Sequence, residues 1–377
     1  MRILILGGTG AMGLALVQIL CEQSSNEIFV TSRKDYDDKE NVHYIKGNAQ
    51  DDVWIKKVLA LKPWDVIVDF MIYSTEHFRK RHSLLLSSAV QYVFFSSSRV
   101  YADAHGEKIT EETPRLLDTT KDQIYLKTDE YSLAKAREEN ILRNSEQKNW
   151  TIIRPYITYN DERLQLGTME KEAWLYRAIQ GRTVVFTKDV ADTITTMTYG
   201  YDVAKGIASI IGKESALGQI FHITQPNFMT WSEVANIYQK TFKKITNREM
   251  KIKYLNNSKE FSEVFSNHWQ VYCDRLYPRT FDNSKILGFL GEDYSWVSME
   301  NGLTNCITRF VEGKQHFLTI NWEAEGWMDR QTGERTLLSE IPTASQRIAY
   351  IFTRYLPYEI ASFLLNCLRN IKKIVKL

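Results

Sequence analysis

The segment that most constrains the fold is residues 7–13, which read GGTGAMG directly after the apolar run Ile3–Leu6. It places glycine at positions 7, 10 and 13, ahead of a helical pattern from Leu14 to Cys21. Glycine is required where a chain turns sharply and where its backbone must approach a pyrophosphate closely. The following helix offers free N–H groups and a positive dipole end to phosphates. The segment predicts a dinucleotide-binding turn; the alternative is an ordinary tight turn between a strand and a helix.

Short apolar strands alternate with helical patterns through the first half of the chain. The predicted strands are residues 3–6, 27–31, 42–45, 65–70, 92–95 and 151–153, and the helical segments include 14–21, 52–61 and about 129–143. Continuous apolar strands separated by helices indicate a parallel sheet covered on both faces. The predicted fold class is therefore α/β: a doubly wound parallel sheet of the Rossmann type, with a smaller mixed C-terminal substrate domain and a helical C-terminal extension.

The length of 377 residues, of which 44% are hydrophobic, is sufficient for two domains. We expect a nucleotide-binding core at residues 1–160. A substrate-binding region is expected at 161–320, with 199–217 returning to the core. Residues 321–377 are expected to form an extension with amphipathic basic helices.

Composition excludes several classes of protein. The 48 basic and 46 acidic residues give a formal charge of +2, which argues against a nucleic-acid partner. The four cysteines are widely spaced and form no disulfide or zinc pattern, so a reducing cytoplasm is the expected location. The seven histidines form no metal-binding pair, and no metal is expected. No secretion signal or membrane span is expected either.

The second predicted strand ends at Thr31-Ser32-Arg33-Lys34. Sites selective for NAD usually place an acidic residue there, to bind the ribose 2′-hydroxyl. A guanidinium at Arg33 suits a 2′-phosphate instead, with help from the Ser32 hydroxyl. This turn predicts that NADP(H) is the preferred cofactor, with NAD(H) as the alternative. The other interpretation of these residues is a basic turn that is exposed to solvent and binds no cofactor.

Two segments match the pattern Tyr-x-x-x-Lys, at Tyr131–Lys135 and at Tyr201–Lys205. The spacing of four puts the phenol and the ammonium on one helix face, where the cation favours the ionised phenol. Such a tyrosine can donate or accept a proton near neutral pH. Position favours the first pair, because it follows the serine run 96–98, which comes directly after the fifth strand. Hydroxyls there lie at the carboxyl edge of the sheet, where ligands bind in such folds.

The glycine segment, the serine run ending in Val100-Tyr101, the Tyr131–Lys135 pair and the segment RPYITY at 154–159 occur in this order. Together they resemble the extended short-chain dehydrogenase/reductases, the NAD(P)-dependent epimerase/dehydratase family, over roughly residues 1–290. The resemblance implies that Ser97, four before Tyr101, is the catalytic hydroxyl, with Ser98 as the fallback. It also puts Asn48 near the adenine and Met71 in place of a small residue near the cofactor. The implied catalytic residues are Ser97, Tyr131 and Lys135, and the implied cofactor-binding residues are Gly7, Gly10, Met12, Gly13, Ser32, Arg33, Asn48, Met71 and Lys135.

Departures from the family pattern limit the choice of reaction. Sugar-nucleotide 4,6-dehydratases of this family have an Asp-Glu pair where this chain has Ser98-Arg99. Many sugar-nucleotide enzymes have asparagine at the position of Ile157. The leading hypothesis is an NADPH-dependent reductase of a keto group on a nucleotide-activated 4-keto sugar, as used in polysaccharide biosynthesis. The alternatives are a nucleotide-sugar 4-epimerase and a non-catalytic relative that binds RNA or a protein. Arg163, Arg177 and Arg279 are candidates to clamp a substrate diphosphate.

Apolar residues recur at helical spacing through the tail, and Pro357 is expected to divide it into two helices. Residues 345–377 contain six basic residues and one acidic residue, Glu359, for a net charge of +5. A basic amphipathic helix can lie on an anionic membrane. The alternative is that the tail packs on the protein's own body or on a second subunit of a homodimer. A weak peripheral membrane contact of a cytoplasmic protein is therefore one of two hypotheses for the tail.

Overall fold

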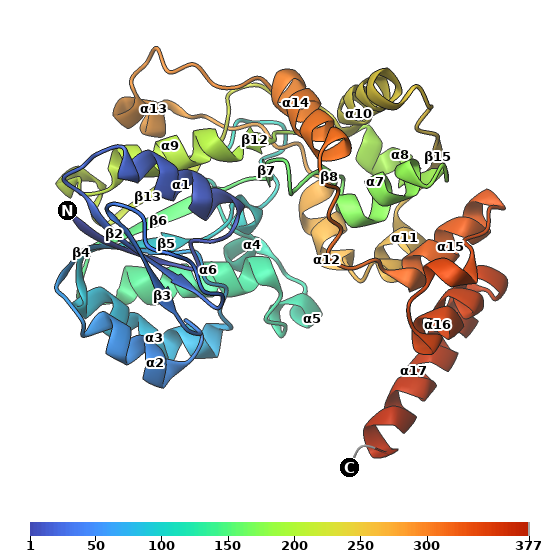
Figure 1. Ribbon diagram of the computed structural model, residues 1–377, viewed down its shortest axis with the longest axis horizontal. Coiled ribbons are helices and arrows are strands. Elements are labelled where there is room, and N and C mark those ends of the chain that lie inside the picture. Colours follow the sequence, from blue (N-terminus) through green and yellow to red (C-terminus); the bar gives the residue numbers. More distant parts are fainter. Residues whose placement is uncertain (376–377) are drawn as a thin grey trace. The chain divides into compact units, whose positions relative to one another are not determined.

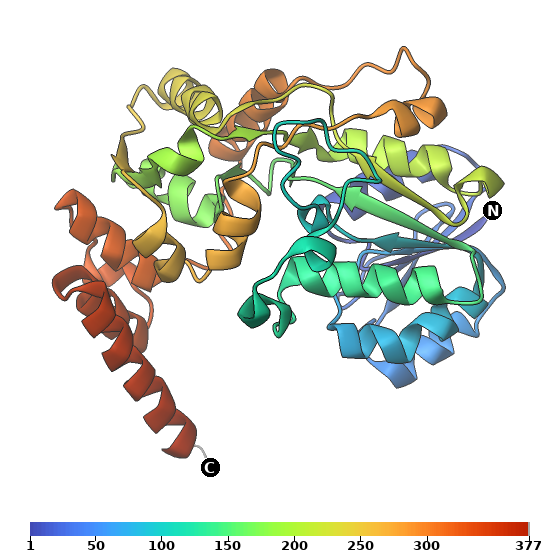
Figure 2. The same cartoon turned by 180° about the vertical axis from the view of Figure 1, so that it is seen from behind.

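The computed structural model describes the backbone of residues 1–375 and the side chains of 1–10 and 12–370. Lys376 of the basic tail lies outside the described residues. The chain forms two compact units (Figures 1 and 2). Unit 1 contains Met1–Asn160, Thr196–Phe228 and Pro278–Gly302. Unit 2 contains Asp161–Thr195, Met229–Tyr277 and Leu303–Leu377. No helix of the described part of the chain is long and apolar enough to cross a membrane.

Unit 1 is built on a seven-stranded sheet in the order β13-β6-β5-β4-β1-β2-β3, in which all neighbours are parallel. The strands are β1 (Arg2–Leu6), β2 (Glu27–Ser32), β3 (Val42–Lys46), β4 (Trp64–Asp69), β5 (Ala89–Phe95), β6 (Trp150–Pro155) and β13 (Gln219–Ile223). The first six are the predicted strands. The fold class predicted from the alternating pattern is confirmed. The seventh strand is supplied by the returning segment Thr196–Phe228, and it pairs with β6.

Helices cover both faces of this sheet, as Figure 1 shows. One apolar core lies between the sheet and helices α1 (Ala11–Cys21) and α9 (Gly200–Ile210). The other lies beneath α2 (Asp52–Leu59), α3 (Thr75–Ser87) and α6 (Tyr131–Asn144). Because the strands are buried on both sides, they read as continuous apolar runs rather than as alternating patterns. Unit 1 also contains η1 (Ser98–Val100), α4 (Leu116–Thr119), α5 (Gln123–Leu126), β7 (Thr158–Tyr159), β12 (Thr198–Tyr199), η2 (Glu214–Ala216) and α13 (Ser284–Leu290).

The fully buried carboxylate of Glu139 on α6 joins three segments of unit 1. It accepts hydrogen bonds from the Ser96 hydroxyl after β5 at 2.5 Å and from Arg154 Nε and Nη2 on β6 at 2.8 and 2.7 Å. Arg115 Nη1 donates to it at 3.1 Å. Burial alone would raise the pKa of Glu139, but Arg154, Ser96 and Arg115 hold it below its usual value. This carboxylate therefore fixes α6 against the ends of two central strands.

Unit 2 is mixed. Its strands are β8 (Gln165–Leu166), β9 (Met169–Glu170), β10 (Val184–Thr187), β11 (Ile194–Thr195), β14 (Met229–Thr230) and β15 (Ile252–Leu255), and they form three two-stranded sheets. Its helical segments include α7 (Lys171–Ile179), α8 (Lys188–Ala191), α10 (Trp231–Thr246), α11 (Lys259–Val264), α12 (His268–Gln270), η3 (Val271–Arg275), α15 (Trp322–Thr332) and η4 (Leu338–Glu340). Helix α14 (Met299–Glu312) leads from unit 1 into unit 2. Thr230 and Glu233 form a capping box at the start of α10.

The C-terminal segment is attached to unit 2 through a buried arginine. Arg177 on α7 is 0% exposed, and its Nη1 donates to Glu325 Oε2 at 2.9 Å and to Asp329 Oδ1 at 3.0 Å, both on α15. Its Nη2 pairs with Glu334 at 3.1 Å. Beyond α15, the tail forms α16 (Ala344–Tyr355) and α17 (Tyr358–Val375). The predicted break at Pro357 is confirmed.

We predict that Glu139→Gln destabilises the protein strongly. The substitution leaves the buried guanidinium of Arg154 without its carboxylate, and breaking a buried ion pair costs about 3–5 kcal/mol. Urea unfolding of the two proteins measures the change. The control is Glu76→Gln on α3, since the Glu76 side chain is 62% exposed and pairs only at the surface. A surface pair is worth about 0–1 kcal/mol. Equal unfolding midpoints for the two variants would contradict the role assigned to Glu139.

Candidate active site

The turn between β1 and α1 is shaped by close backbone contacts. Gly7 has a φ of +71°, and a Cβ at this position would lie 2.9 Å from the Met71 sulfur. A Cβ on Gly13 would lie 2.4 Å from the carbonyl oxygen of Gly8. Gly10 is the N-cap residue of α1, and no side chain caps this helix. The turn therefore needs glycine for a left-handed backbone and for helix-to-strand packing, and it leaves the N–H groups of α1 available to an anion.

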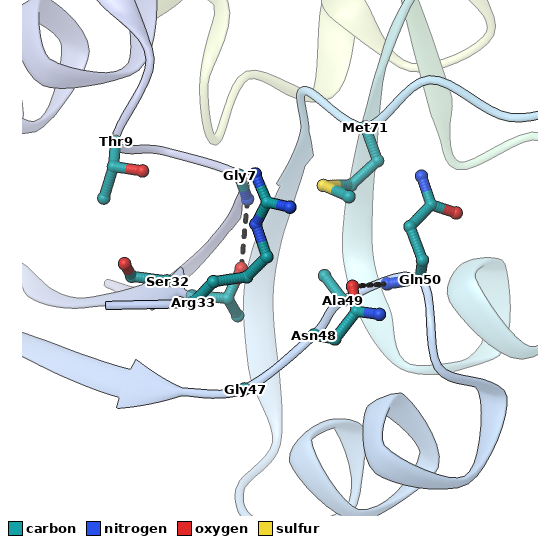
Figure 3. Close-up of a pocket in the computed structure, with 10 residues that line it drawn as sticks. Gly7, Thr9, Ser32, Arg33, Gly47, Asn48, Ala49, Gln50 and Met71 are labelled. Atoms are coloured by element: carbon teal, nitrogen blue, oxygen red, sulfur yellow. Dashed lines mark hydrogen bonds between the residues drawn. The ribbon is translucent and has the colours of Figure 1, made fainter. Parts of the chain in front are cut away.

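A cavity of about 330 Å³ adjoins this turn. Its lining residues are Gly7, Thr9, Thr31, Ser32, Arg33, Gly47, Asn48, Ala49, Gln50 and Met71. The Thr31 hydroxyl accepts from the Gly7 amide at 3.0 Å, and Asn48 Oδ1 accepts from the Gln50 amide at 3.1 Å (Figure 3). Arg33 is exposed and forms no ion pair with any described residue. Its guanidinium is therefore available to an anionic group entering the cavity.

The structure brings five of the proposed cofactor residues together at this cavity: Gly7, Ser32, Arg33, Asn48 and Met71. Gly10 and Gly13 shape the turn without lining the cavity, and Met12 packs against the apolar core under α1. Sequence reasoning missed the lining residues Thr9, Gly47, Ala49 and Gln50. A Cβ at Gly47 would lie 2.0 Å from the indole ring of Trp54. Because this requirement for glycine comes from a side chain seven residues later, the sequence around Gly47 gives only a weak indication of it.

The three serines after β5 have different partners. The Ser96 hydroxyl donates to Glu139, and the Ser98 hydroxyl donates to the Arg154 carbonyl oxygen at 2.8 Å. The Ser97 hydroxyl oxygen accepts from the Arg99 amide at 3.2 Å, and no described residue accepts its hydrogen. Ser97 is 7% exposed, whereas Ser98 is 0% exposed. Of the two serines considered for this role, Ser97 is thus the one with a hydroxyl hydrogen available to a ligand.

Tyr131 is the first residue of α6, directly after the N-cap residue Glu130. It is half-buried, and its hydroxyl makes no hydrogen bond to any described residue. The Arg99 guanidinium carbon lies 5.3 Å from the Tyr131 ring centroid, and the same guanidinium pairs with Glu130 at 2.6 Å. Arg99 thus connects η1, which begins one residue after Ser97, to the start of α6. The arrangement leaves the phenol group available as a proton donor or acceptor.

Lys135 is 2% exposed, and its Nζ donates to Glu138 Oε2 at 2.9 Å. Its ammonium also lies 4.6 Å from the centroid of the Phe94 ring on β5. Glu138 is fully buried, and its Oε1 has no hydrogen-bond partner. Burial raises the pKa of Glu138 to about 7, although the Lys135 ammonium acts in the opposite direction. The carboxylates of Asp69 and Asp129 add to the increase. Sequence reasoning missed this partner of Lys135.

The second Tyr-x-x-x-Lys pair lies on the opposite face of the sheet. Tyr201 and Lys205 belong to α9, which packs with α1, whereas α6 packs on the other core. Tyr201 borders the apolar core, and the Lys205 ammonium lies 5.3 Å from its ring centroid. This pair is separated from Tyr131 and Lys135 on α6 by the sheet.

The expectation that Arg177 and Arg279 clamp a diphosphate is wrong. Arg177 is fully buried among three carboxylates. Arg279 is 1% exposed, and its two Nη atoms donate to the carbonyl oxygens of Ala102 and Tyr101 at 3.1 Å each. Both guanidinium groups therefore bind partners inside the protein and are not exposed to a substrate. Arg163 lies at the surface and pairs with Glu170 at 3.3 Å.

Comparison with known proteins identifies a family match over most of the chain. Residues 1–259 match the family described as the RmlD substrate binding domain. Among curated proteins, the chloroplast stem-loop binding protein of 41 kDa b from Arabidopsis thaliana is 24% identical over 248 residues. This match covers 62% of the present chain and 61% of the Arabidopsis protein, so the chain spans about three fifths of that relative's length.

Solved structures with a similar fold include two enzymes. A dTDP-glucose 4,6-dehydratase from Bacillus anthracis in complex with NAD is 18% identical, with a TM-score of 0.63; the match covers 84% of this chain and 98% of that one. A UDP-glucuronic acid 4-epimerase from Bacillus cereus, in complex with UDP-glucuronic acid and NAD, is 15% identical, with a TM-score of 0.60. That match covers 83% of this chain and 99% of the epimerase. At these identities, the likeness establishes the fold.

We predict that Glu138 makes the stability of the protein depend on pH. Its carboxyl group has a usual pKa near 4.5 and a folded-state pKa of about 7. Between these values, the unfolded chain loses the proton first, so the free energy of unfolding falls as the pH rises. The stabilisation is fully present below about pH 4.5 and is lost by about pH 7, on the order of 1–3 kcal/mol in total.

Glu138→Gln removes this contribution. Urea unfolding at about pH 5 and about pH 7.5 should show a smaller loss of stability in Glu138→Gln than in the wild type. Glu325 also has a pKa raised to about 7 by burial, but it is present in both proteins and cancels in the comparison. The same pH dependence in both proteins would show that Glu138 is not the titrating group.

Proposed function

Because the chain belongs to the RmlD substrate binding domain family, within the extended short-chain dehydrogenase/reductases, we propose that it is an NADPH-dependent reductase of a keto group on a nucleotide-activated sugar. One observation carries the proposal. At the carboxyl edge of the sheet that holds the glycine turn, the hydroxyl hydrogens of Ser97 and Tyr131 have no acceptor among the described residues. Two such hydroxyl groups suit a substrate carbonyl oxygen.

The residues at the glycine turn fit a nicotinamide dinucleotide. Side chains are excluded at Gly7 and Gly13 by contacts of 2.9 and 2.4 Å, so the backbone stays open to a pyrophosphate. The cavity of about 330 Å³ lined by Ser32, Arg33 and Asn48 suits an adenosine moiety. Arg33 is the only cation that lines it among the described residues, and a charge-assisted bond to a 2′-phosphate favours NADP(H). The bound dinucleotide supplies hydride transfer at this edge of the sheet.

The side chains then divide the proton chemistry between them. As a hydride reaches the carbonyl carbon, the carbonyl electron pair moves to oxygen, and the Tyr131 hydroxyl donates its proton to that oxygen. The Ser97 hydroxyl donates a hydrogen bond to the same oxygen and orients it. Lys135 lies one helical turn after Tyr131, and its ammonium favours the phenolate that proton donation leaves behind. Glu138 holds this ammonium in place.

The proposed substrate class is supported by the family. The proposed reaction is supported by positions at which this chain differs from other members of the family. The proteins of similar fold include a dTDP-glucose 4,6-dehydratase and a UDP-glucuronic acid 4-epimerase in complex with UDP-glucuronic acid, which supports a nucleotide sugar as the substrate class. The Asp-Glu pair of the 4,6-dehydratases is replaced here by Ser98, which is buried and bonded to Arg154, and by Arg99, which pairs with Glu130. Without an acid and a base at these positions, water elimination has no proton carriers there. Four widely spaced cysteines support a cytoplasmic location.

A 4-epimerase would use the same three side chains. It would oxidise and re-reduce one carbon, with no net consumption of cofactor. Incubation with NADPH and a panel of 4-keto and 4-hydroxy nucleotide sugars separates the two reactions. Net NADPH oxidation with a keto sugar supports the reductase. Isomerisation of a hydroxy sugar without NADPH oxidation would show that the protein is an epimerase and not a reductase.

RNA binding is the second candidate function, because the Arabidopsis relative is named for binding a stem-loop. It makes no use of Ser97, Tyr131 or Lys135, and the formal charge of +2 gives little attraction to phosphates. A mobility-shift assay with a stem-loop RNA at physiological salt tests it. A shifted RNA band, together with no activity on any nucleotide sugar of the panel, would favour RNA binding.

We predict that Tyr131→Phe abolishes most turnover and leaves cofactor binding intact. Phenylalanine has no proton to donate, and general acid–base catalysis contributes about 10²–10⁴-fold to a rate. Steady-state kinetics give kcat, and fluorescence titration gives the cofactor affinity. Tyr201→Phe is the matched control, since it alters the same motif on the opposite face of the sheet and should keep its kcat. An inactive Tyr201→Phe beside an active Tyr131→Phe would reverse the assignment.

We predict that the wild type binds NADP(H) more tightly than NAD(H), by roughly 10- to 150-fold, since a charge-assisted hydrogen bond is worth ~1.5–3 kcal/mol. Arg33→Ala should remove this preference by weakening NADP(H) binding alone. Calorimetric titration of both cofactors measures the two affinities. The control is Lys213→Ala, an exposed cation just after α9 that does not line the cavity. A preference that survives Arg33→Ala would disprove the role of Arg33.

A further inference from the structure

Helix α17 is fixed to unit 2 along one side. Ala361 and Leu365 on this side are 0% and 5% exposed. The Tyr358 hydroxyl, one turn before Ala361, donates to the Glu263 carbonyl oxygen on α11 at 3.1 Å. Near the other end of the described side chains, Arg369 pairs with Glu323 on α15. These contacts hold the helix in one orientation and determine which of its faces is left outside.

A second apolar stripe on α17 is exposed. Ile360, Phe363 and Leu368 are 51%, 66% and 37% exposed, and Cys367 is exposed between the last two. Their positions at i, i+3, i+7 and i+8 define one helix face. Helix α16 adds Ile348 and Tyr355, two turns apart, at 41% and 54% exposed. Apolar side chains grouped in this way mark a contact surface, whereas single exposed apolar residues are ordinary.

The same segment is more positively charged than the chain as a whole. The basic residues from 345 onward are Arg347, Arg354, Arg369, Lys372, Lys373 and Lys376, and the only acidic residue is Glu359. The segment has a net charge of +5 in a chain whose total is +2, so the rest of the chain is at −3. Arg369 remains 53% exposed even in its ion pair. An exposed apolar stripe within a helical segment of net positive charge is typical of helices that lie at anionic lipid interfaces.

We propose that α17 docks along an anionic lipid surface. Its outer stripe, Ile360, Phe363 and Leu368, enters the headgroup region. The net positive charge of the tail attracts the anionic headgroups. Because the inner side of the helix is held by Glu263 and Glu323, the surface is ready without rearrangement of unit 2. The proposal does not depend on the reaction assigned to unit 1.

A second copy of the chain is a poorer partner for this face. Two tails with a net charge of +5 each would be brought together, and like charges at an interface oppose association. A stable interface also uses about 20–30 residues on each side. The outer face of α17 offers only a few exposed apolar side chains among the described residues. Charge complementarity and the extent of the surface therefore both favour lipid.

Co-sedimentation of the full-length protein with vesicles tests the proposal. One set contains phosphatidylcholine alone, and the other contains about one third phosphatidylserine. We expect binding to the anionic set only. Raising the salt from about 0.05 M to about 0.5 M shortens the screening length about threefold and should release most of the bound protein.

The double variant Ile360→Glu/Phe363→Glu should reduce the bound fraction at least about fivefold, because it places carboxylates at the lipid face. Lys372→Glu/Lys373→Glu should do the same by reversing charge. Leu318→Glu is the matched control, because Leu318 is 76% exposed in unit 2 and lies outside the tail. All substituted apolar positions are exposed, so thermal unfolding should be unchanged, and this measurement identifies any variant that misfolds.

Three results would overturn the proposal. The first is wild-type protein that stays in the supernatant with anionic vesicles at low salt. The second is equal binding to both vesicle sets, which would leave no role for the basic residues. The third is a wild-type dimer in sedimentation velocity that Ile360→Glu/Phe363→Glu dissociates, which would assign the outer stripe to a second copy.

Discussion

The carboxylate of Glu139 receives hydrogen bonds from Ser96 after β5, from Arg154 on β6 and from the connecting segment at Arg115. Ser96 immediately precedes Ser97, and Glu139 lies two turns after Tyr131 on the same helix. The distance between the two candidate catalytic hydroxyl groups is therefore set by one buried network rather than by a flexible loop. Hydrogen bonds to a buried carboxylate are strong because the local dielectric is low, so this network favours one arrangement of these segments.

The parts of the fold that could be predicted from the sequence are those with local causes. The first six strands are continuous apolar runs, and their burial on both faces is what makes them visible as such. The glycine turn is recognisable because Gly7 has a positive φ and Gly13 is constrained by the backbone of Gly8. The break at Pro357 and the capping box at Thr230 are likewise local. Order along the chain favours Tyr131 over Tyr201, because Tyr131 follows the serine run after β5.

Features that depend on contacts between distant segments could not be predicted. Nothing near Arg177 indicates that its partners are Glu325, Asp329 and Glu334, so it resembled a free cation suited to a diphosphate. Glu138 lies one helical turn from Lys135, which makes their pairing possible, but the sequence does not show that both are buried. The pairing of β13 with β6 likewise joins segments that are far apart in the sequence.

The partners of Arg177 also have a temporal consequence. During synthesis, the helix that carries this arginine leaves the ribosome long before its partners: Glu334 follows 157 residues later. At about 5–20 residues per second, the guanidinium waits roughly 10–30 s for its carboxylates. Throughout this interval, unit 2 lacks the charges that allow Arg177 to be buried. Unit 2 therefore closes only after the segment with α15 and Glu334 has been synthesised, and a nascent chain stalled before α15 leaves Arg177 without these carboxylates.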